Sequence, residues 1–284
     1  MERIWCRATC LAVATATVLL PFAAIAGEAG PSEALSLERG RRDQPRVALT
    51  FDGGSDAGDT ELILAVLADR GVTATFFLTG EFMERHPDLV RRIAAGGHEV
   101  GNHTWSHPHL TTWERTHRHD TLPGLDRERM ARELARTADA YERLTGLPLA
   151  PLWRAPYGEL NDEIARWAGT AGWQHVGWSR EGGAGRHTLD SLDWVADRSS
   201  RNFFAASRLL ERILSFDARG AGLNGGIVLM HLCARRDDPL SARLGALVDE
   251  LRARGYQPCT VGELRRELGP PATVVALAAP QALH

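Results

Sequence analysis

Short apolar runs alternate along this chain with longer segments whose apolar residues recur every three or four positions. The first run covers residues 46–51 and is continuous enough for a buried strand. Residues 60–70 follow with helical spacing of their apolar positions and stop at Gly71. Further strands are expected at 73–78, 98–101, 152–154, 174–178, 226–231 and 256–260, and further helices at 84–95, 126–144, 162–171, 203–216 and 240–254.

This repeated order of strand and helix predicts an α/β fold with a parallel sheet, because each crossover helix returns the chain to the same end of the sheet. So many units in one domain favour a (β/α) barrel. In such barrels the functional side chains gather at the carboxyl ends of the strands. The chemically useful side chains at those ends are Asp52, His103, His107, Arg154 and His231.

The first 26 residues have the composition of a cleaved signal peptide. Arg3 and Arg7 form a short basic region, an apolar stretch follows, and Ala24-Ile25-Ala26 offers the small residues after which a signal peptidase cuts. An uncleaved membrane anchor is the alternative, but its strongly apolar part, residues 11–20, is short for a span that needs roughly 20 apolar residues. We therefore expect an exported protein, periplasmic or extracellular, with no stable membrane span.

Composition divides the rest of the chain into one large domain and two short flanks. Residues 27–44 are rich in Gly, Ser, Glu and Arg and predict a flexible lead-in, and residues 269–284 predict an unpacked tail. Residues 45–268 are enough for one catalytic barrel with a sizeable core. The formal net charge of −3 argues against a nucleic-acid partner, which requires a basic face.

Two histidines four residues apart, His103 and His107, lie in one predicted turn that Pro108 closes. At that spacing both imidazoles point the same way and can meet at one cation, although such a pair also arises by coincidence. Asp52 ends the first strand and is followed by Gly53-Gly54, which is also a common turn sequence. An acid at a strand end and a histidine pair after a later strand together indicate a metal-assisted hydrolase.

Five short motifs occur in order along the chain. They are Thr50-Phe51-Asp52, Asn102-His103-Thr104-Trp105-Ser106-His107, Arg154-Ala155-Pro156-Tyr157, Asp193-Trp194 and Leu229-Met230-His231, with Ala74-Thr75-Phe76-Phe77-Leu78 between the first two. With these motifs the chain resembles the polysaccharide deacetylases, the chitooligosaccharide-deacetylase homology domain of the carbohydrate esterases, over about residues 45–268. The resemblance implies a distorted (β/α) barrel of parallel strands with fewer than eight regular units. It also implies metal-dependent removal of N-acetyl or O-acetyl groups from a cell-wall or chitin-like glycan.

The resemblance further implies a role for each motif residue. His103 and His107 would hold a divalent metal, Zn²⁺ or alternatively Co²⁺, whose bound water is the nucleophile. Asp52 would take the proton from that water as the general base. His231, arriving from the opposite side of the barrel, would protonate the leaving amine as the general acid.

The remaining motif residues would support this acid and base. Asp193 would hold the general acid in its imidazolium form, and Arg154 would pair with the general base and keep it ionised. The backbone N–H of Tyr157 would help to bind the oxyanion, and Trp194 would offer an apolar face to a pyranose ring. The substrate would be an acetylated glycan such as peptidoglycan or chitin oligomers.

The chain departs from the family pattern at residue 53. The family usually has a second aspartate directly after the first, as a metal ligand, whereas this chain has Gly53. A catalytic zinc normally takes three protein ligands and a water, so two histidines leave the set one ligand short. Asp56, with Asp59 behind it, is the nearest replacement. Otherwise water completes the metal's shell, or the metal is lost and the protein only binds glycan.

A metal-free glycan-binding protein and an amidase acting on a small non-sugar amide are the alternatives to a polysaccharide deacetylase. The polar loop 113–125 after the histidine turn either lines the substrate cleft or is an ordinary solvated loop. Cys233 and Cys259 would remain after loss of the signal peptide. They are either free thiols or the two halves of a disulfide in an exported protein.

Overall fold

The computed structural model describes residues 35–181, 187–217 and 219–269. The expected signal peptide, the first part of the expected lead-in and nearly all of the expected tail lie outside these residues. Within the described ranges, no helix has the length and apolar character needed to cross a membrane. Cys233 and Cys259 are both free thiols.

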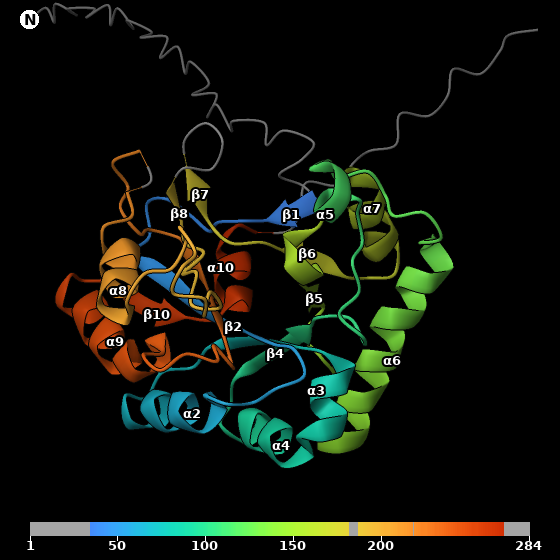
Figure 1. Cartoon of the computed structure of the whole chain (residues 1–284). Coiled ribbons are helices and arrows are strands. Elements are labelled where there is room, and N and C mark those ends of the chain that lie inside the picture. Colours follow the sequence, from blue (N-terminus) through green and yellow to red (C-terminus); the bar gives the residue numbers. More distant parts are fainter. Residues whose placement is uncertain (1–34, 182–186, 218, 270–284) are drawn as a thin grey trace, which may run out of the picture.

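The core of the fold is an eight-stranded parallel sheet that curls into a partial barrel (Figure 1). Its strands are β1 (Ser36–Leu37), β2 (Arg46–Gly53), β3 (Thr75–Leu78), β4 (Glu99–Asn102), β5 (Leu152–Trp153), β6 (Gln174–Val176), β9 (Gly226–His231) and β10 (Gln257–Cys259). The strand order is β1-β6-β5-β4-β3-β2, and β9 pairs with the other edge of β2. β10 pairs with the first residues of β2. Every pairing in this sheet is parallel, as the alternation of strands and helices predicts.

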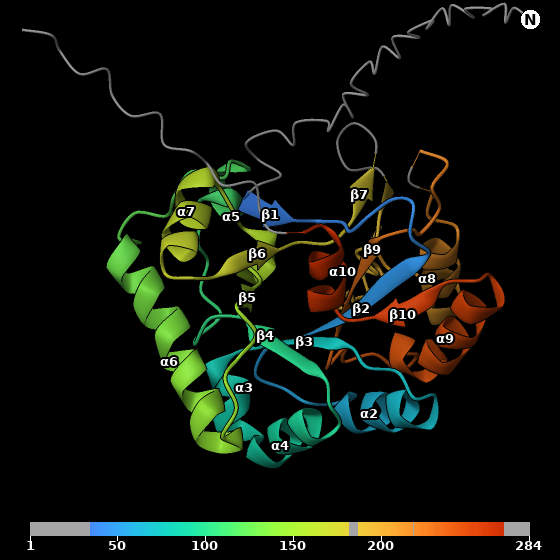
Figure 2. The ribbon, with the colours of Figure 1, turned by 180° about the vertical axis from the view of Figure 1, so that it is seen from behind.

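Most of the helices cover the outside of the curled sheet, as Figure 2 shows from behind. They are α2 (Thr60–Asp69), α3 (Gly80–Arg85), α4 (Pro87–Ala95), α5 (Trp113–Thr116), α6 (Arg127–Thr145), α7 (Asp162–Thr170), α8 (Ala206–Leu214), α9 (Leu244–Ala253) and α10 (Val261–Glu267). Shorter elements are the antiparallel pair β7 (Arg180–Glu181) and β8 (His187–Thr188), and the 3₁₀ turns Pro156–Gly158 and Leu240–Arg243. The prediction of a distorted (β/α) barrel with fewer than eight regular units is confirmed.

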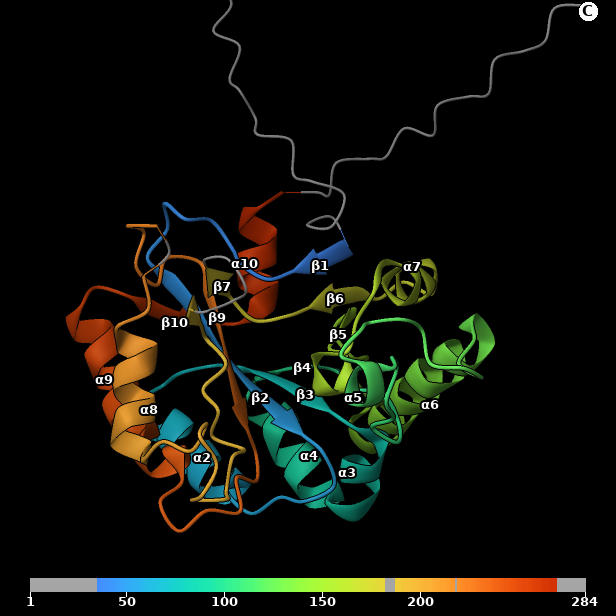
Figure 3. The same cartoon turned by 45° about the horizontal axis from the view of Figure 1, so that its top comes forward.

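Alternation along β2 separates the two faces of the sheet. Val47, Leu49 and Phe51 belong to the buried cluster that includes side chains of α2 and α9, whereas Ala48 belongs to a second cluster inside the curl. Asp52 continues the inward series at the carboxyl end of β2, because successive side chains of a strand point to opposite faces. The tilted view of Figure 3 shows β2 beside β9 in the middle of the molecule. The fold therefore presents Asp52 at the mouth of the curled sheet.

Three expected helices have different bounds in the structure. The expected helix 84–95 is two helices, α3 and α4, because Pro87 begins α4 and His86 before it leaves the helical region with φ of −129°. The expected helix 240–254 begins as a 3₁₀ turn before α9. The expected helix 203–216 is shorter at both ends and forms α8.

The described part of the expected lead-in packs on the edge of the sheet. Ser36 and Leu37 form β1 and pair with β6, and Nη1 of Arg39 donates to the carbonyl oxygen of Asn224 (2.6 Å). Residues 36–37 therefore lie beside β6, and Arg39 and Gly40 lie beside residues 224–225, in places that the polar composition of the segment does not predict.

Candidate active site

A cavity of about 890 Å³ opens where the strands end, at the mouth of the curled sheet. Six of the residues predicted from motifs line it: Asp52, His103, His107, Tyr157, Trp194 and His231. Arg154 and Asp193 lie behind it and are hydrogen-bonded to lining residues. The structure thus brings all eight predicted site residues together.

Asp52 is held by a buried arginine. Nη1 of Arg154 donates to Oδ1 of Asp52 (2.7 Å) and to the hydroxyl oxygen of Thr50 (2.9 Å). The rest of the guanidinium donates to the carbonyl oxygens of Val176 (3.1 Å) and Gly177 (3.0 Å). Burial raises the pKa of Asp52, but the charge and hydrogen bond of Arg154, together with the imidazoles of His103 and His231, outweigh burial and lower that pKa below its usual value. The Asp52 carboxylate is therefore ionised at neutral pH.

His231 is held by Asp193 through two hydrogen bonds. Its backbone N–H donates to Oδ2 of Asp193 (2.9 Å), and its ring Nδ1 donates to Oδ1 (2.7 Å). Burial lowers the pKa of His231, but Asp193 and further carboxylates outweigh burial and raise that pKa to about 9. The imidazolium is thus the stable form at neutral pH, and Nε2 is the ring atom left to donate a proton.

The residues predicted as acid and base, His231 and Asp52, lie on neighbouring strands. β9 pairs with β2, and His231 is the register partner of Asp52. The expectation that His231 arrives from the opposite side of the barrel is therefore wrong, because the order of strands in the sheet differs from their order along the chain. Adjacent strand ends keep this pair close without help from a loop.

The two histidines lie in a turn that its own polar contacts hold. Asn102 accepts a hydrogen bond from the N–H of Thr104 (2.9 Å) and donates one to the carbonyl oxygen of Leu134 in α6 (2.8 Å). Thr104 and His107 have left-handed backbones, with φ of 65° and 53°. Such conformations cost energy in non-glycine residues and cluster at functional sites. The imidazole rings of His103 and His107 consequently stand edge to face, with centroids 4.8 Å apart.

Both imidazoles are neutral at neutral pH. Nδ1 of His103 lies 2.9 Å from the carbonyl oxygen of Arg154, which can only accept, so Nδ1 carries the proton and Nε2 the lone pair. Burial lowers the pKa of His103, and burial together with the neighbouring His103 lowers the pKa of His107 to about 3. Nε2 of His103 lies 3.6 Å from Oδ2 of Asp52. Two neutral imidazoles beside a carboxylate suit a divalent metal such as Zn²⁺.

Residue 53 points away from these histidines. Gly53 belongs to the outward-facing series of β2, next after Phe51. A Cβ placed on Gly53 would lie 2.8 Å from Cδ2 of Leu78 and 2.9 Å from Cδ1 of Leu232. A side chain there would start within the apolar layer between sheet and helices, and not at the cavity.

The two acids considered as replacements are engaged elsewhere. Asp56 forms an ion pair with Arg235, and Oδ2 of Asp59 accepts a hydrogen bond from the N–H of Ala234 (3.0 Å). Over residues 35–181, 187–217 and 219–269, no group of three or more His, Cys, Asp or Glu side chains is arranged to hold a metal ion. His103 and His107 are therefore a two-ligand set, which water or substrate oxygen would have to complete.

Tyr157 stands at the rim of the cavity between two histidines. Its backbone is left-handed, with φ of 57°. Its ring meets His107 edge to face with centroids 4.5 Å apart, and it stacks on His109 at 4.2 Å with planes 8° apart. Nδ1 of His109 lies 2.7 Å from Oε1 of Glu159, which is 1% exposed and also accepts from the N–H of Leu110. This contact network fixes the orientation of Tyr157.

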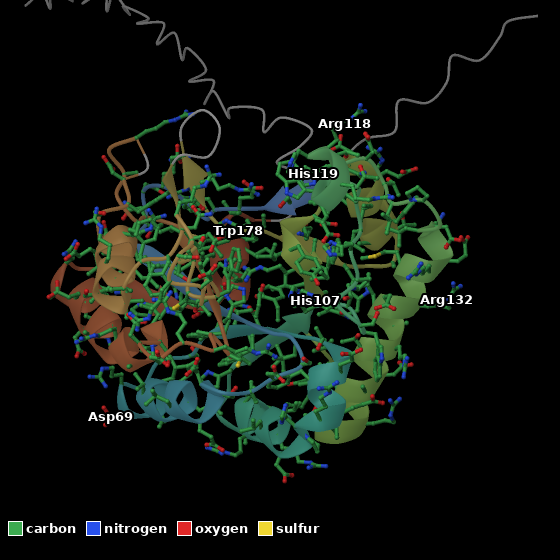
Figure 4. The ribbon with its side chains drawn as sticks, viewed as in Figure 1. Asp69, His107, Arg118, His119, Arg132 and Trp178 are labelled. Carbon is green, nitrogen blue, oxygen red and sulfur yellow. The ribbon has the colours of Figure 1, made fainter. Side chains whose placement is uncertain are left out.

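Sequence reasoning missed His109, Glu159 and Asp190, which all line the cavity. His109 and Glu159 each lie two residues beyond a motif residue, and this closeness in the sequence is the feature that could have indicated a place at the cavity. Burial raises the pKa of Asp190, whose Oδ1 accepts from the N–H of Leu192 (2.9 Å). Figure 4 shows His107 near the middle of the molecule, with Trp178 toward the β7–β8 pair.

Several known proteins with similar sequences are deacetylases. The chitooligosaccharide deacetylase of Rhizobium leguminosarum bv. trifolii is 33% identical over 227 residues, covering 75% of this chain and 89% of that protein. The peptidoglycan-N-acetylglucosamine deacetylase of Bacillus cereus is 34% identical over 192 residues, covering 66% of this chain. The chain spans 62% of the Bacillus cereus protein, less than two thirds of its length.

The fold also matches a solved structure that its authors describe as a pseudoenzyme. This protein of carbohydrate esterase family 4, from Bacillus anthracis, superposes with a TM-score of 0.65 over 82% of this chain and 69% of that chain. At 24% sequence identity the likeness concerns the fold alone. The sequence profile of the family described as polysaccharide deacetylase matches residues 39–176. Together with the 33% identity across nearly nine tenths of the Rhizobium protein, this match shows that the chain belongs to the polysaccharide deacetylase family.

Proposed function

We propose that this chain is a metal-dependent deacetylase that hydrolyses N-acetyl groups on a cell-wall or chitin-like glycan. The observation that carries the proposal is the pairing of an ionised Asp52 with a protonated His231 at adjacent strand ends in one cavity. Environments that push the pKa values of two neighbouring groups apart mark them as base and acid. A protein that only binds sugar has no need of such a pair.

Asp52 and His231 move the two protons that amide hydrolysis requires. Asp52 removes a proton from the attacking water, and Arg154 keeps its carboxylate ionised until that moment. Nε2 of His231 then donates a proton to the departing amine, while Asp193 holds Nδ1 and the ring plane. In an O-acetyl ester the leaving group is an alcohol oxygen, which depends less on protonation than an amine does. N-acetyl substrates therefore need His231 more than O-acetyl substrates do.

Tyr157 and Trp194 act on the rest of the substrate. The backbone N–H of Tyr157 binds the oxyanion that forms as water adds to the acetyl carbonyl, and the stack with His109 fixes its direction. Trp194 is 52% exposed at the cavity and offers an apolar face to the sugar ring that carries the acetyl group.

His103 and His107 would hold the divalent metal through Nε2 of His103 and a ring nitrogen of His107. When bound, Zn²⁺ or Co²⁺ would polarise the acetyl carbonyl and lower the pKa of a water molecule. The backbone carbonyl of Arg154 fixes the tautomer of His103, so that its lone pair faces the cavity.

Export to the periplasm or outside the cell, with residues 45–268 as the catalytic barrel, completes the proposal. It is supported by the signal-peptide pattern of residues 1–26. A glycan in the cell wall lies on that side of the membrane.

The test is acetate release from a panel of chitin oligomers, peptidoglycan and acetylated xylan. Each substrate is assayed with the protein as purified, after chelator treatment, and after adding back Zn²⁺ or Co²⁺. We expect release from at least one N-acetylated glycan, loss of release with chelator and recovery with metal. A protein that releases no acetate under any of these conditions is not a deacetylase.

A second candidate, a glycan-binding protein without turnover, is favoured by one observation. The position after Asp52 is Gly53 and not an acid, and among the described residues no third side chain joins His103 and His107 as a metal ligand. Retention on chitin or peptidoglycan, with no divalent metal by elemental analysis even after incubation with millimolar Zn²⁺, would establish this candidate in place of the enzyme.

A further inference from the structure

The loop from Thr111 to Thr121 is a built feature of the cavity rim. Thr111 and Thr121 form an antiparallel bridge, and the N–H of Thr112 donates to the carbonyl oxygen of Asp120 (2.9 Å). Helix α5 fills the loop between them. None of the five family motifs includes this segment, so the family resemblance gives it no role.

Polar contacts fix this loop to helix α7. Nδ2 of Asn161 donates to the carbonyl oxygen of His119 and to the hydroxyl oxygen of Thr121, both at 2.9 Å. The hydroxyl of Thr121 in turn donates to Oε2 of Glu163 (2.6 Å). A loop anchored at this many points presents its side chains in defined directions.

Trp113 is the large apolar side chain that this loop presents. It lines the cavity and is 44% exposed. Its ring stacks on His119 with centroids 4.6 Å apart and planes 13° apart, and it meets His117 edge to face at 5.6 Å. Two histidines thus support the indole while much of it stays open to solvent at the cavity. An exposed, supported aromatic face beside a cleft is typical of a ligand contact.

Contacts between side chains connect Trp113 to the proposed reaction centre. The next residue, Glu114, approaches Nε2 of His109 with Oε2 at 3.6 Å, and His109 stacks on Tyr157. Trp194 lines the same cavity but belongs to the segment whose Asp193 holds His231 on β9. Tyr157 follows β5, and three strands separate β5 from β9 in the sheet. Trp113 is thus linked to the part of the cavity near Tyr157, whereas Trp194 is linked to the part near His231.

The charge at the cavity indicates which sugars fit. Carboxylates line it from several elements: Asp52, Asp56, Glu81, Glu114, Glu159 and Asp190. The arginine among its lining residues, Arg235, is paired with Asp56. Asp52 is paired with Arg154 and the imidazolium of His231 also lines the cavity, so Glu81, Glu114 and Glu159 carry the remaining negative charge. A cleft with this excess of carboxylates disfavours an anionic sugar and accepts one that is uncharged or carries an amine.

We propose that Trp113 is a second sugar-stacking platform, so that the site takes an oligosaccharide running past the reaction centre from Trp194 to Trp113. The unit at Trp113 is an uncharged or amine-bearing hexosamine. This inference rests on the proposed function for the identity of the reaction centre, and it adds the length and charge of the substrate. Chitin oligomers fit both conditions, whereas chains with a free carboxylate on each disaccharide do not.

The test is binding, which needs no turnover. Dissociation constants are measured by calorimetry for N-acetylglucosamine oligomers of two to six units, with the protein as purified and with Trp113→Ala and Trp113→Phe. We expect affinity to rise with oligomer length, Trp113→Ala to lose roughly 2- to 10-fold for the longer oligomers, and Trp113→Phe to keep part of the gain. Arg118→Ala is the matched control, because Arg118 lies on the same loop, is largely exposed and does not line the cavity.

Three outcomes would overturn this inference. They are equal loss of affinity at every length, unchanged affinity of Trp113→Ala for the longer oligomers, and tighter binding of carboxylated than of partly deacetylated oligomers. Failure of the proposed function is a separate result, since it would appear as absence of acetate release while the length dependence of binding persists.

Discussion

The two halves of the site differ in how far the protein itself supplies the partners of their functional groups. On β2 and β9, each proton-transfer group is locked by a buried partner: Asp52 by Arg154 at 2.7 Å, and His231 by Asp193 at 2.7 Å. On the other half, His103 and His107 share no third protein ligand within the described residues. The proposed acid–base half is complete in the protein alone, whereas the proposed metal half would depend on what binds there.

This difference follows from where the residues lie. Asp52 and His231 extend two neighbouring strands, so sheet pairing sets their separation. His107 lies in a turn with a left-handed backbone, which polar contacts of Asn102 hold in place. Sheet pairing therefore holds the proposed acid and base together, whereas the placement of the two histidines depends on a single turn. Each prediction below alters one half and leaves the other intact.

Asp52→Asn has the largest expected effect. An amide cannot accept the proton of water, so turnover should fall by roughly 10²- to 10⁴-fold, the usual contribution of a general base. Asparagine keeps an oxygen for Arg154, and metal content should stay that of the unaltered protein. Acetate release and elemental analysis measure the two effects. Asp56→Asn is the control, because it removes an acid of the same cavity that is paired with Arg235.

Near-normal turnover in Asp52→Asn would show that Asp52 is not the general base. Equal loss in Asp56→Asn would show that any acid of the cavity contributes, and not Asp52 in particular.

His107→Ala tests the other half. Removing one of two imidazole ligands should lower Zn²⁺ affinity by at least 10-fold, and activity should follow occupancy. Asp56→Ala should leave Zn²⁺ content unchanged, because the structure pairs Asp56 with Arg235. Zinc content is measured after equilibrium dialysis at a series of free Zn²⁺ concentrations. An Asp56→Ala protein that loses zinc as readily as His107→Ala would make Asp56 the missing ligand.

Asp193→Asn changes the pH dependence of the acid–base half. The pKa of His231 is raised to about 9, above its ordinary 6.5, so the acid form and the stability that it contributes are fully present below pH 6.5. Both are lost as the pH rises through 9. In Asp193→Asn the falling limb of kcat/KM should move toward lower pH by about one to two units, since the largest raising influence is gone. If the falling limb does not move, it reports the pKa of a group other than His231.

The sequence predicts the acid–base half better than the metal half. Asp52 and His231 end apolar runs, so a period-2 pattern is enough to place them at strand ends. The packing around residue 53 depends on the side chains of Leu78 and Leu232, which arrive from other parts of the chain. His109 is recognisable as functional only once its ring is seen on Tyr157. Contacts made after folding, and not local pattern, decide these positions.

Gly53→Ala tests whether packing forbids a side chain at the missing ligand position. The new Cβ would lie 2.8 Å from Leu78 and 2.9 Å from Leu232, both buried, so the neighbours must shift. Overpacking of this kind costs about 1–3 kcal/mol, and the denaturant midpoint should fall accordingly. Gly54→Ala is the matched control, since a Cβ there meets nothing within 4 Å.

Gly53→Asp should destabilise further than Gly53→Ala, because its carboxylate starts in the same apolar layer between Leu78 and Leu232. Gly53 does not have a positive φ, so neither substitution strains the backbone and both test packing alone. We expect Gly53→Asp to leave zinc affinity unimproved, measured by the same dialysis. Tighter zinc binding with an unchanged denaturant midpoint would instead mean that β2 can turn residue 53 toward the histidines. In that case the identity of residue 53, and not the packing around it, would account for the missing ligand, and one substitution would restore the metal half.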